Sequence, residues 1–460
     1  MGNLRQTLRE TAELIADYRE ALPELRVGPV AGRDEVRESL ESELPAQGES
    51  IESIMREMVA KAGPGLMSSA GPRYFGFVVG GSYDAALVAD MLAVGWDQVA
   101  FNEATSPAAL AFEDLAGTWL KELLHIPSSA SVGFVTGAQA ANTVGIAAGR
   151  WSVLRDHGWD VGRDGLNGAP RVRVVAGAER HGTIDRALRL LGLGESSLVE
   201  VPARSDGAMN AEALAEALES SPDGPTIVCA QAGNVNTGAF DDVAAVASAA
   251  RAHRAWLHVD GAFGLWAAAS PRMAHYVTGL ELADSWGCDG HKWLNVPYDS
   301  GYAFCAQPDV HAASMAYTAD YLTGQVAGRE FGGGDYVPES SRRARGFATW
   351  AVLRSLGRNG VAALVDRCCH LARRLAAGLD GLDGIDVVND VVLNQVLVRV
   401  GDTETTDRVE RWIQEEGTCW LGATTWRGER LLRVSVSNWS TTEADMDRCV
   451  EVIARARKVS

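Results

Sequence analysis

Short apolar runs alternate with helical patterns between about residues 130 and 306 of this 460-residue chain, and this alternation most constrains its fold. The runs are SVGFVT, VRVVAG, TIVCAQA, AWLHVDG and GYAFCA. They are typical of parallel strands that are buried on both faces, and the helical segments between them fit crossover connections. We therefore predict an α/β fold with a mostly parallel sheet and helices on both faces. Such sheets bind ligands beside the carboxyl ends of their strands.

The N-terminal segment is predicted to form an amphipathic helix with one buried face. Its apolar side chains recur at helical spacing, at Leu4, Leu8, Ile15, Tyr18 and Leu22. Such a helix needs a partner surface on which its apolar face can pack.

The C-terminal part is predicted to form a smaller α+β domain. After the glycine-rich segment GREFGGGDYVPESS, the pattern indicates a helix that ends at Gly357 or Gly360. The runs VVLNQVLVRV and ERLLRVSVSN indicate strands, and a capping box from Ser440 to Glu443 indicates a final helix. The expected segments are an N-terminal helical arm over 1–65, a large domain over 66–335 and a small C-terminal domain over 336–460.

Charge, apolar stretches and cysteine content argue against several classes of partner and location. The chain has 60 acidic and 42 basic residues and a formal net charge of −18, which disfavours binding to nucleic acid. Its first twenty residues are charged throughout and lack the apolar core of a secretory signal. The longest apolar stretch, residues 85 to 95, is short and contains Asp90, so no membrane span is expected. Seven cysteines without framework spacing suit a reducing cytoplasm.

Two of the predicted strands are followed by candidate binding residues. The segment FVTGAQAANTV places the backbone N–H groups of Gly137, Ala138 and Gln139 at the start of a helix, where an anion such as phosphate fits. A turn between a strand and a helix also favours small residues for purely structural reasons. His181 follows VRVVAG, and such a histidine can be a catalyst or simply a helix cap.

Two further strand ends carry an aspartate and a lysine. Asp260 ends AWLHVDG, and the small Gly261 and Ala262 after it leave room for a flat ring. The alternative is a turn aspartate. Lys292 in DSWGCDGHKWLN can form an imine with an aldehyde, or its stem can pack on Trp293 while its charge reaches water.

Together these groups match the needs of pyridoxal 5′-phosphate (PLP). Its phosphate needs a helix N-terminus, its ring needs a stacking partner, its pyridine nitrogen needs a carboxylate and its aldehyde needs an amine. The sequence presents these four kinds of group at successive strand ends. We therefore predict a PLP site and no metal.

The chain resembles the group II PLP-dependent amino-acid decarboxylases, which include aromatic L-amino-acid decarboxylase. The resemblance rests on HVDGA, ADS and HKWLN in that order, and it extends from GPRYFGFVVGGSYDAALVADML to SRRARGFATWAVLRSLG. It implies the PLP-dependent transferase fold type I, with a small C-terminal domain. It also implies a homodimer with shared active sites and interlocked N-terminal segments. The implied reaction is the loss of CO2 from an L-amino acid to give an amine.

The resemblance also implies roles for individual residues. Lys292 would form the imine with PLP, and Asp260 would pair with the pyridine nitrogen. His181 would stack on the ring and help to orient the substrate carboxylate, with Ala262 on the other face. His291 would contact the phosphate or the substrate carboxylate.

The remaining implied site residues lie around the cofactor and on a loop. Ala138, Gln139 and Ser285 match the positions of phosphate ligands. Asn234 or Asn236 matches a residue near the ring hydroxyl. Tyr321 in YTADYLTG matches the loop tyrosine that donates a proton. The loop tyrosine of decarboxylases reaches into the partner subunit's site, and aldehyde-forming relatives often carry phenylalanine there.

The chain departs from the family pattern in two places. Asp289-Gly290 stands where aromatic decarboxylases often have Asn-Pro, and an ionised aspartate cannot donate a hydrogen bond to phosphate. The segment FVVGGSYD lacks the aromatic and proline residues that shape an aromatic pocket. The sequence therefore does not determine which side chain the substrate carries.

Three alternative functions also stay open. They are oxidative decarboxylation to an aldehyde, cleavage of a carbon–carbon bond by a lyase or aldolase, and PLP binding without catalysis.

Overall fold

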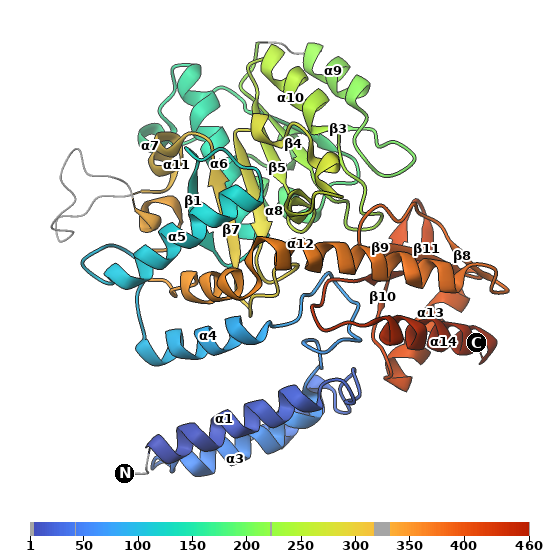
Figure 1. The fold of residues 1–460 in the computed structure, drawn as a ribbon. Coiled ribbons are helices and arrows are strands. Elements are labelled where there is room, and N and C mark those ends of the chain that lie inside the picture. Colours follow the sequence, from blue (N-terminus) through green and yellow to red (C-terminus); the bar gives the residue numbers. More distant parts are fainter. Residues whose placement is uncertain (1–3, 42, 221–222, 317–331, 460) are drawn as a thin grey trace. The chain divides into compact units, whose positions relative to one another are not determined.

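The structure is a computed structural model that describes residues 4–41, 43–220, 223–316 and 332–459 (Figure 1). The chain divides into two compact units. The smaller unit comprises Met1–Gly81, Leu371–Val388 and Val396–Ser460, and the larger comprises Ser82–His370 and Asn389–Gln395. The expected boundaries at residues 65 and 335 stay predictions.

A seven-stranded sheet organises the described part of the larger unit, in the order β1-β7-β6-β5-β4-β2-β3. Strands β2 to β6 pair in parallel, whereas β7 is antiparallel to both β1 and β6. The predicted mostly parallel sheet is therefore confirmed. The apolar runs quoted from the sequence do not include β3 or β6, although Lys292 was expected to follow a strand. The strands are β1 (Ser131–Val135), β2 (Arg173–Gly177), β3 (Leu198–Val201), β4 (Thr226–Gln231), β5 (Trp256–Asp260), β6 (Ser285–Asp289) and β7 (Gly301–Cys305).

Helices cover both faces of this sheet (Figure 1). Helix α6 packs on β4 to β7 and on α8 and α11, whereas α9 and α10 pack on each other and on β3 to β5. The apolar strand residues that the sequence analysis singled out, such as Val174 and Ile227, are fully buried against Ile146 and Leu154 of α6. The helices are α4 (Asp84–Trp96), α5 (Pro107–Leu123), α6 (Ala138–Asp156), α7 (Val161–Asp164), α8 (Gly182–Leu190), α9 (Ala211–Glu219), α10 (Val243–Ala252), α11 (Pro308–Met315) and α12 (Gly346–Leu379).

Helix α12 contains the predicted helix end. Gly357 has a φ of 61° and a ψ of 177°, so two helical stretches meet at this residue. Cys368 and Cys369 are buried farther along α12 and pack in the interior. All seven cysteines lie in the described residues, and each is buried and free. No helix within the described ranges is long and apolar enough to cross a membrane.

The smaller unit contains a four-stranded sheet in the order β10-β11-β9-β8, with β8 (Ile385–Val387), β9 (Gln395–Val400), β10 (Gly422–Trp426) and β11 (Glu429–Ser435). Helices α13 (Thr403–Glu416) and α14 (Glu443–Val459) pack on each other. The predicted capping box from Ser440 to Glu443 is wrong. The backbone N–H of Asp445 donates to Thr442 Oγ1, and that of Thr442 donates to Asp445 Oδ2, so the box begins two residues later.

The N-terminal segment forms α1 (Leu4–Ala21), α2 (Arg33–Leu40) and α3 (Ile51–Ala62). The predicted helix over the first residues is confirmed, and α1 packs on α3. Its apolar face is only partly covered within this unit, because Leu4 and Leu8 are each 60% exposed.

Candidate active site

The carboxyl ends of β1, β2, β4, β5 and β6 meet at one edge of the large sheet. Because β7 is antiparallel to both β1 and β6, β1 runs in the same direction as the parallel strands. This edge gathers the segments that carry Gly137, His181, Asn234, Asp260 and Lys292. The predicted order of groups along the chain thus becomes a cluster in space.

Asp289, the last residue of β6, lies at the centre of the lysine segment. Its side chain is 3% exposed. Oδ1 accepts a hydrogen bond of 2.5 Å from the backbone N–H of Ala138, the first residue of α6. Lys292 Nζ lies 2.9 Å from Oδ2, and His291 Nε2 lies 3.2 Å from Oδ1. The lysine and the N-terminus of α6 therefore share one buried carboxylate.

The hydrogen bonds of His291 define its neutral tautomer. Its Nδ1 accepts from the backbone N–H of Ser300 at 3.1 Å, so the proton of the neutral ring is on Nε2, which faces Asp289. Burial lowers the pKa of His291, and the nearby Asp289 charge opposes that shift. The ring stacks on Tyr298, with a centroid distance of 4.2 Å. His291 is therefore held firmly beside Lys292.

Asp260, the last residue of β5, is a second buried carboxylate and is 4% exposed. Oδ1 accepts from the backbone N–H of Ala262 at 3.2 Å, and Oδ2 accepts from Thr183 Oγ1 at 3.5 Å. Both of these donors are neutral. The Asp260 charge is thus positioned without being neutralised by them.

Thr183 joins several site residues, although it is not among the site residues predicted from the sequence. His181 caps α8, since its Nδ1 accepts from the backbone N–H of Thr183, and the same Nδ1 lies 3.0 Å from Thr183 Oγ1. Asn142 Nδ2 donates to this hydroxyl at 3.1 Å, and Gln139 Nε2 donates to the Thr183 carbonyl at 3.2 Å. The hydroxyl therefore links His181 and Asp260 to helix α6. The only sequence signal was a threonine two residues after a candidate histidine.

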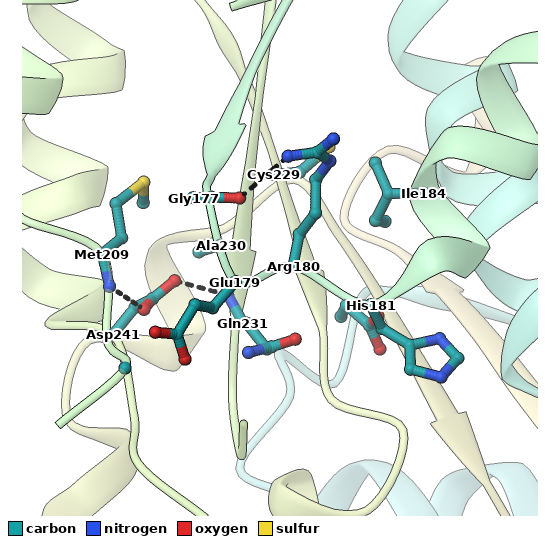
Figure 2. Close-up of a pocket in the computed structure, with 12 residues that line it drawn as sticks. Gly177, Glu179, Arg180, His181, Ile184, Met209, Cys229, Ala230, Gln231 and Asp241 are labelled. Carbon is teal, nitrogen blue, oxygen red and sulfur yellow. Dashed lines mark hydrogen bonds between the residues drawn. The ribbon is translucent and has the colours of Figure 1, made fainter. Parts of the chain in front are cut away.

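A small cavity of about 10 Å³, room for one water molecule, lies between the ends of β2, β4 and β5 (Figure 2). Figure 2 shows His181 and Asp241 on opposite sides of it. The Asp241 carboxylate accepts from the backbone N–H groups of Met209 and Gln231, both at 2.7 Å. Burial raises the pKa of Asp241 to about 6. His181 and Asp260 both line this cavity, so it adjoins the cluster.

Asn234 and Asn236 lie in the turn after β4. Asn234 is buried, and its Oδ1 accepts from the backbone N–H groups of Asn236 and Thr237 at 2.8 and 3.1 Å. Its Nδ2 lies 3.4 Å from the carbonyl oxygens of Glu179 and Gly207. The Asn234 side chain therefore shapes this turn.

Ser285 lies away from the cluster, so the prediction that it binds the phosphate is wrong. It begins β6, whereas the lysine segment follows the other end of that strand. Its hydroxyl is fully buried and contacts Trp256 Nε1 and His258 Nδ1, each at 2.9 Å. Four residue steps along a strand span about 13 Å, so Ser285 is too far from the N-terminus of α6. Tyr321 lies outside the described residues.

The residues at this edge fit PLP. The first-turn N–H groups of α6 have no partners within the helix and can hold a phosphate. A Cβ on Gly137 would come within 2.8 Å of His291 Cε1, and a Cβ on Gly301 within 2.4 Å of Gly137 Cα, so the backbone segments approach closely here. A buried carboxylate and a lysine supply the other two groups. Among the described residues, no group of three or more ligating side chains could hold a metal ion.

A family model described as the pyridoxal-dependent decarboxylase conserved domain matches residues 34–400. The chain belongs to this family. Tryptophan decarboxylase 1 from Oryza sativa subsp. japonica is 29% identical over 377 residues, which cover 77% of this chain and 72% of that protein. 4-Hydroxyphenylacetaldehyde synthase from Rhodiola rosea is 27% identical over 352 residues, which cover 75% of this chain and 71% of that protein.

The fold agrees with this membership. A crystal structure of Oryza sativa TDC with PLP and tryptamine matches with a TM-score of 0.92 and 25% identity, and the match covers 99% of this chain and 98% of that one. The chain is thus a PLP-dependent carboxy-lyase of fold type I. Its cofactor is PLP, and its substrates are amino acids.

Proposed function

We propose that this enzyme removes CO2 from an L-amino acid and releases the corresponding amine. The observation that carries the proposal is the position of Asp260 and Lys292 at the carboxyl ends of the neighbouring strands β5 and β6, beside the N-terminus of α6. Bound PLP supplies an electron sink for the carbanion that the loss of CO2 leaves behind. The residues of the chain bind, orient and protonate the reacting groups.

Two residues would act on the cofactor ring and its aldehyde. Lys292 Nζ would hold the cofactor covalently. The Asp260 carboxylate would face the pyridine nitrogen and keep it protonated, which its burial and its neutral hydrogen-bond donors support. A fixed charge in a site shielded from water stabilises developing charge far more than it would in solution.

Other residues would orient the cofactor and the substrate. The first turn of α6, from Ala138 and Gln139 onward, would bind the phosphate, and the absence of a side chain at Gly137 keeps that approach open. The exposed His181 at the start of α8 would stack on the ring, opposite Ala262. His291 would contact the phosphate or the substrate carboxylate.

An aldehyde product is the second candidate, because the relatives include 4-hydroxyphenylacetaldehyde synthase. We favour the amine on the basis of Tyr321, which matches the proton-donating tyrosine of decarboxylases in sequence. A Tyr321→Phe variant should form amine more slowly and produce more aldehyde, ammonia and peroxide under air. Tyr336→Phe is a matched control, because Tyr336 stacks on the buried His311 at 4.8 Å. An unaltered product ratio in Tyr321→Phe would remove this tyrosine from the mechanism.

A substrate screen tests the proposed reaction directly. The purified enzyme with PLP is incubated with each proteinogenic L-amino acid, and CO2, amine, O2 uptake and peroxide are measured. We expect at least one amino acid to release CO2 and amine in equal amounts with little peroxide. O2 consumed in proportion to substrate would support the aldehyde product instead. No CO2 from any amino acid would contradict the proposal.

We also propose a homodimer with shared active sites. An apolar groove of about 710 Å³ runs between α1 and α3 in the smaller unit, with Leu14, Ile15, Met55 and Met58 among its lining residues. In the larger unit, α4 separately exposes apolar side chains, at Val88, Met91, Leu92, Val94 and Trp96. Exposed apolar surfaces that gather on helices in this way are typical of protein–protein interaction sites. Light scattering on a chain without residues 1–25 should show loss of the dimer, and an intact, active dimer would exclude this role for α1.

A further inference from the structure

Asp289 brings a negative charge into the position proposed for the cofactor's phosphate. Its Oδ1 accepts the backbone N–H of Ala138 at the N-terminus of α6, at 2.5 Å. The Asp289 side chain is 3% exposed, so water screens its charge little. A helix N-terminus provides roughly half a positive charge, which suits one bound anion.

The ionisable groups around Asp289 show what balances its charge. Lys292 Nζ lies 2.9 Å from Oδ2, and His291 Nε2 lies 3.2 Å from Oδ1. Burial lowers the pKa of His291, so Lys292 is the principal cation. Burial raises the pKa of both the Cys288 thiol and the Tyr302 phenol, so these two neighbours stay neutral. Two further carboxylates of this region belong to Asp260 and Asp299, and Arg345 Nε pairs with Asp299 Oδ1 at 2.8 Å.

A phosphate at the start of α6 would disturb this balance. The phosphate is a dianion above pH 7, because its second pKa is about 6. Ionised carboxylates and phosphates only accept hydrogen bonds, so neither can donate to the other. In addition, an imine nitrogen keeps at most one N–H, so covalent binding of the cofactor would weaken the contact of Lys292 Nζ with Asp289 Oδ2. Asp289 would then face the phosphate with less compensation from its nearest cation.

We propose that phosphate binding at α6 is coupled to the uptake of one proton by Asp289. The proton comes from solvent and lies between Asp289 Oδ2 and a phosphate oxygen. The protonated Asp289 carboxyl can then donate a hydrogen bond that the phosphate oxygen accepts. Asp289 therefore sets the affinity for PLP and makes that affinity fall as the pH rises. This inference rests on the proposed function, because it uses the proposed phosphate position.

The test compares PLP with pyridoxal, which carries the same aldehyde but has no phosphate. Dissociation constants of the full-length chain are measured by tryptophan fluorescence between pH 7 and 9. The ratio of the two constants isolates the phosphate from the reaction at Lys292. We expect the preference for PLP over pyridoxal to fall about tenfold per pH unit, the response to one coupled proton.

The Asp289→Asn variant should remove this pH dependence. It should bind PLP at least tenfold more tightly than the parent at pH 8.5, with pyridoxal binding unchanged within twofold. Asp284→Asn is the matched control, because Asp284 accepts the Leu257 N–H at 2.8 Å just before the opposite end of β6. That variant should keep the pH dependence of the parent.

Three outcomes separate the possibilities. A PLP-to-pyridoxal preference that is constant with pH in the parent chain overturns the proposal without any variant. An Asp289→Asn chain that binds PLP no more tightly than the parent also overturns it. A parent chain that binds PLP no better than pyridoxal instead refutes the proposed phosphate position, and with it the cofactor orientation under the proposed function.

Discussion

Asp260 and Asp289 end the neighbouring parallel strands β5 and β6, and both are almost fully buried, yet their surroundings differ. Asp260 is bound by the neutral donors of Ala262 and Thr183. Asp289 instead contacts Lys292 and His291 as well as the N-terminus of α6. A similar strand position and similar burial therefore produce two different electrostatic environments.

This difference indicates how one sheet edge can serve two ends of a cofactor. A carboxylate held by neutral donors can still attract an incoming cation such as a protonated pyridine nitrogen. The local charge around a carboxylate that already pairs with a cation of the chain changes only if the carboxylate takes up a proton or if that cation moves. The comparison therefore predicts that charge removal at Asp260 affects chemistry, whereas charge removal at Asp289 affects affinity.

The largest expected effect is the loss of Lys292. Lys292→Ala should abolish both turnover and the yellow colour of the lysine-bound cofactor, because the amine that reacts with the aldehyde is gone. Lys292→Arg should be equally inactive but should keep a cation beside Asp289, so it separates charge balance from covalent binding. Absorbance spectra and turnover measure both effects. A borohydride-stable bond between PLP and the Lys292→Ala chain would contradict the assignment.

The next effect directly compares the two carboxylates. Asp260→Asn should lower kcat about a thousandfold or more, the scale of losing a preorganised electrostatic partner, while PLP stays bound. Asp289→Asn, measured at saturating PLP, should keep kcat within about tenfold of the parent. Steady-state kinetics with an amino acid that the screen identifies provides the measurement. An equal loss of kcat in Asp260→Asn and Asp289→Asn would contradict the proposed difference between the two carboxylates.

Two buried histidines should make the large unit sensitive to acid. Burial lowers the pKa of both His258 and His311 from 6.5 to about 3. The unfolded chain therefore binds more protons than the folded chain between those values. Stability is fully present above pH 6.5 and is lost as the pH falls toward 3, by on the order of a few kcal/mol per histidine. Urea midpoints from pH 7 to 4 should fall less steeply for His258→Gln. A parallel decline in parent and variant would show that His258 does not contribute.

Thr183 should have a smaller effect that acts through Asp260 and His181. Thr183→Val removes the hydroxyl that contacts both residues, and we expect kcat to fall about tenfold, on the scale of one hydrogen bond to a charged group. Thr183→Ser should restore it, because serine keeps the hydroxyl. A positioning role also predicts a shifted pH profile of the cofactor absorbance in the valine variant. A profile identical to that of the parent would leave Thr183 with only a packing role.

The sequence predicted five strands of the large sheet from their apolar runs, but it missed β3, a short strand that reads LVEV, and β6. Strand β6 reads SWGCD and contains no β-branched residue, yet all five of its residues are buried between β5 and β7. Burial rather than intrinsic preference makes it a strand. Thr183 was missed for a similar reason, because its partners Asn142 and Asp260 are far from it in sequence.

The missed strand also explains the error at Ser285, and the smallest predicted effect tests this explanation. Ser285 is seven residues before Lys292, but the extended strand between them carries it to the opposite end of β6. There its hydroxyl contacts Trp256 and His258. Ser285→Ala should therefore change the dissociation constant of PLP by less than twofold. It should instead lower the free energy of unfolding by about 1–3 kcal/mol, because two buried polar groups lose a partner.

Gly137→Ala provides the contrast, since its added methyl group would press on His291 and Asp289 and should weaken PLP binding markedly. If Ser285→Ala weakened PLP binding tenfold without changing stability, the phosphate would have to lie at the other end of the strand.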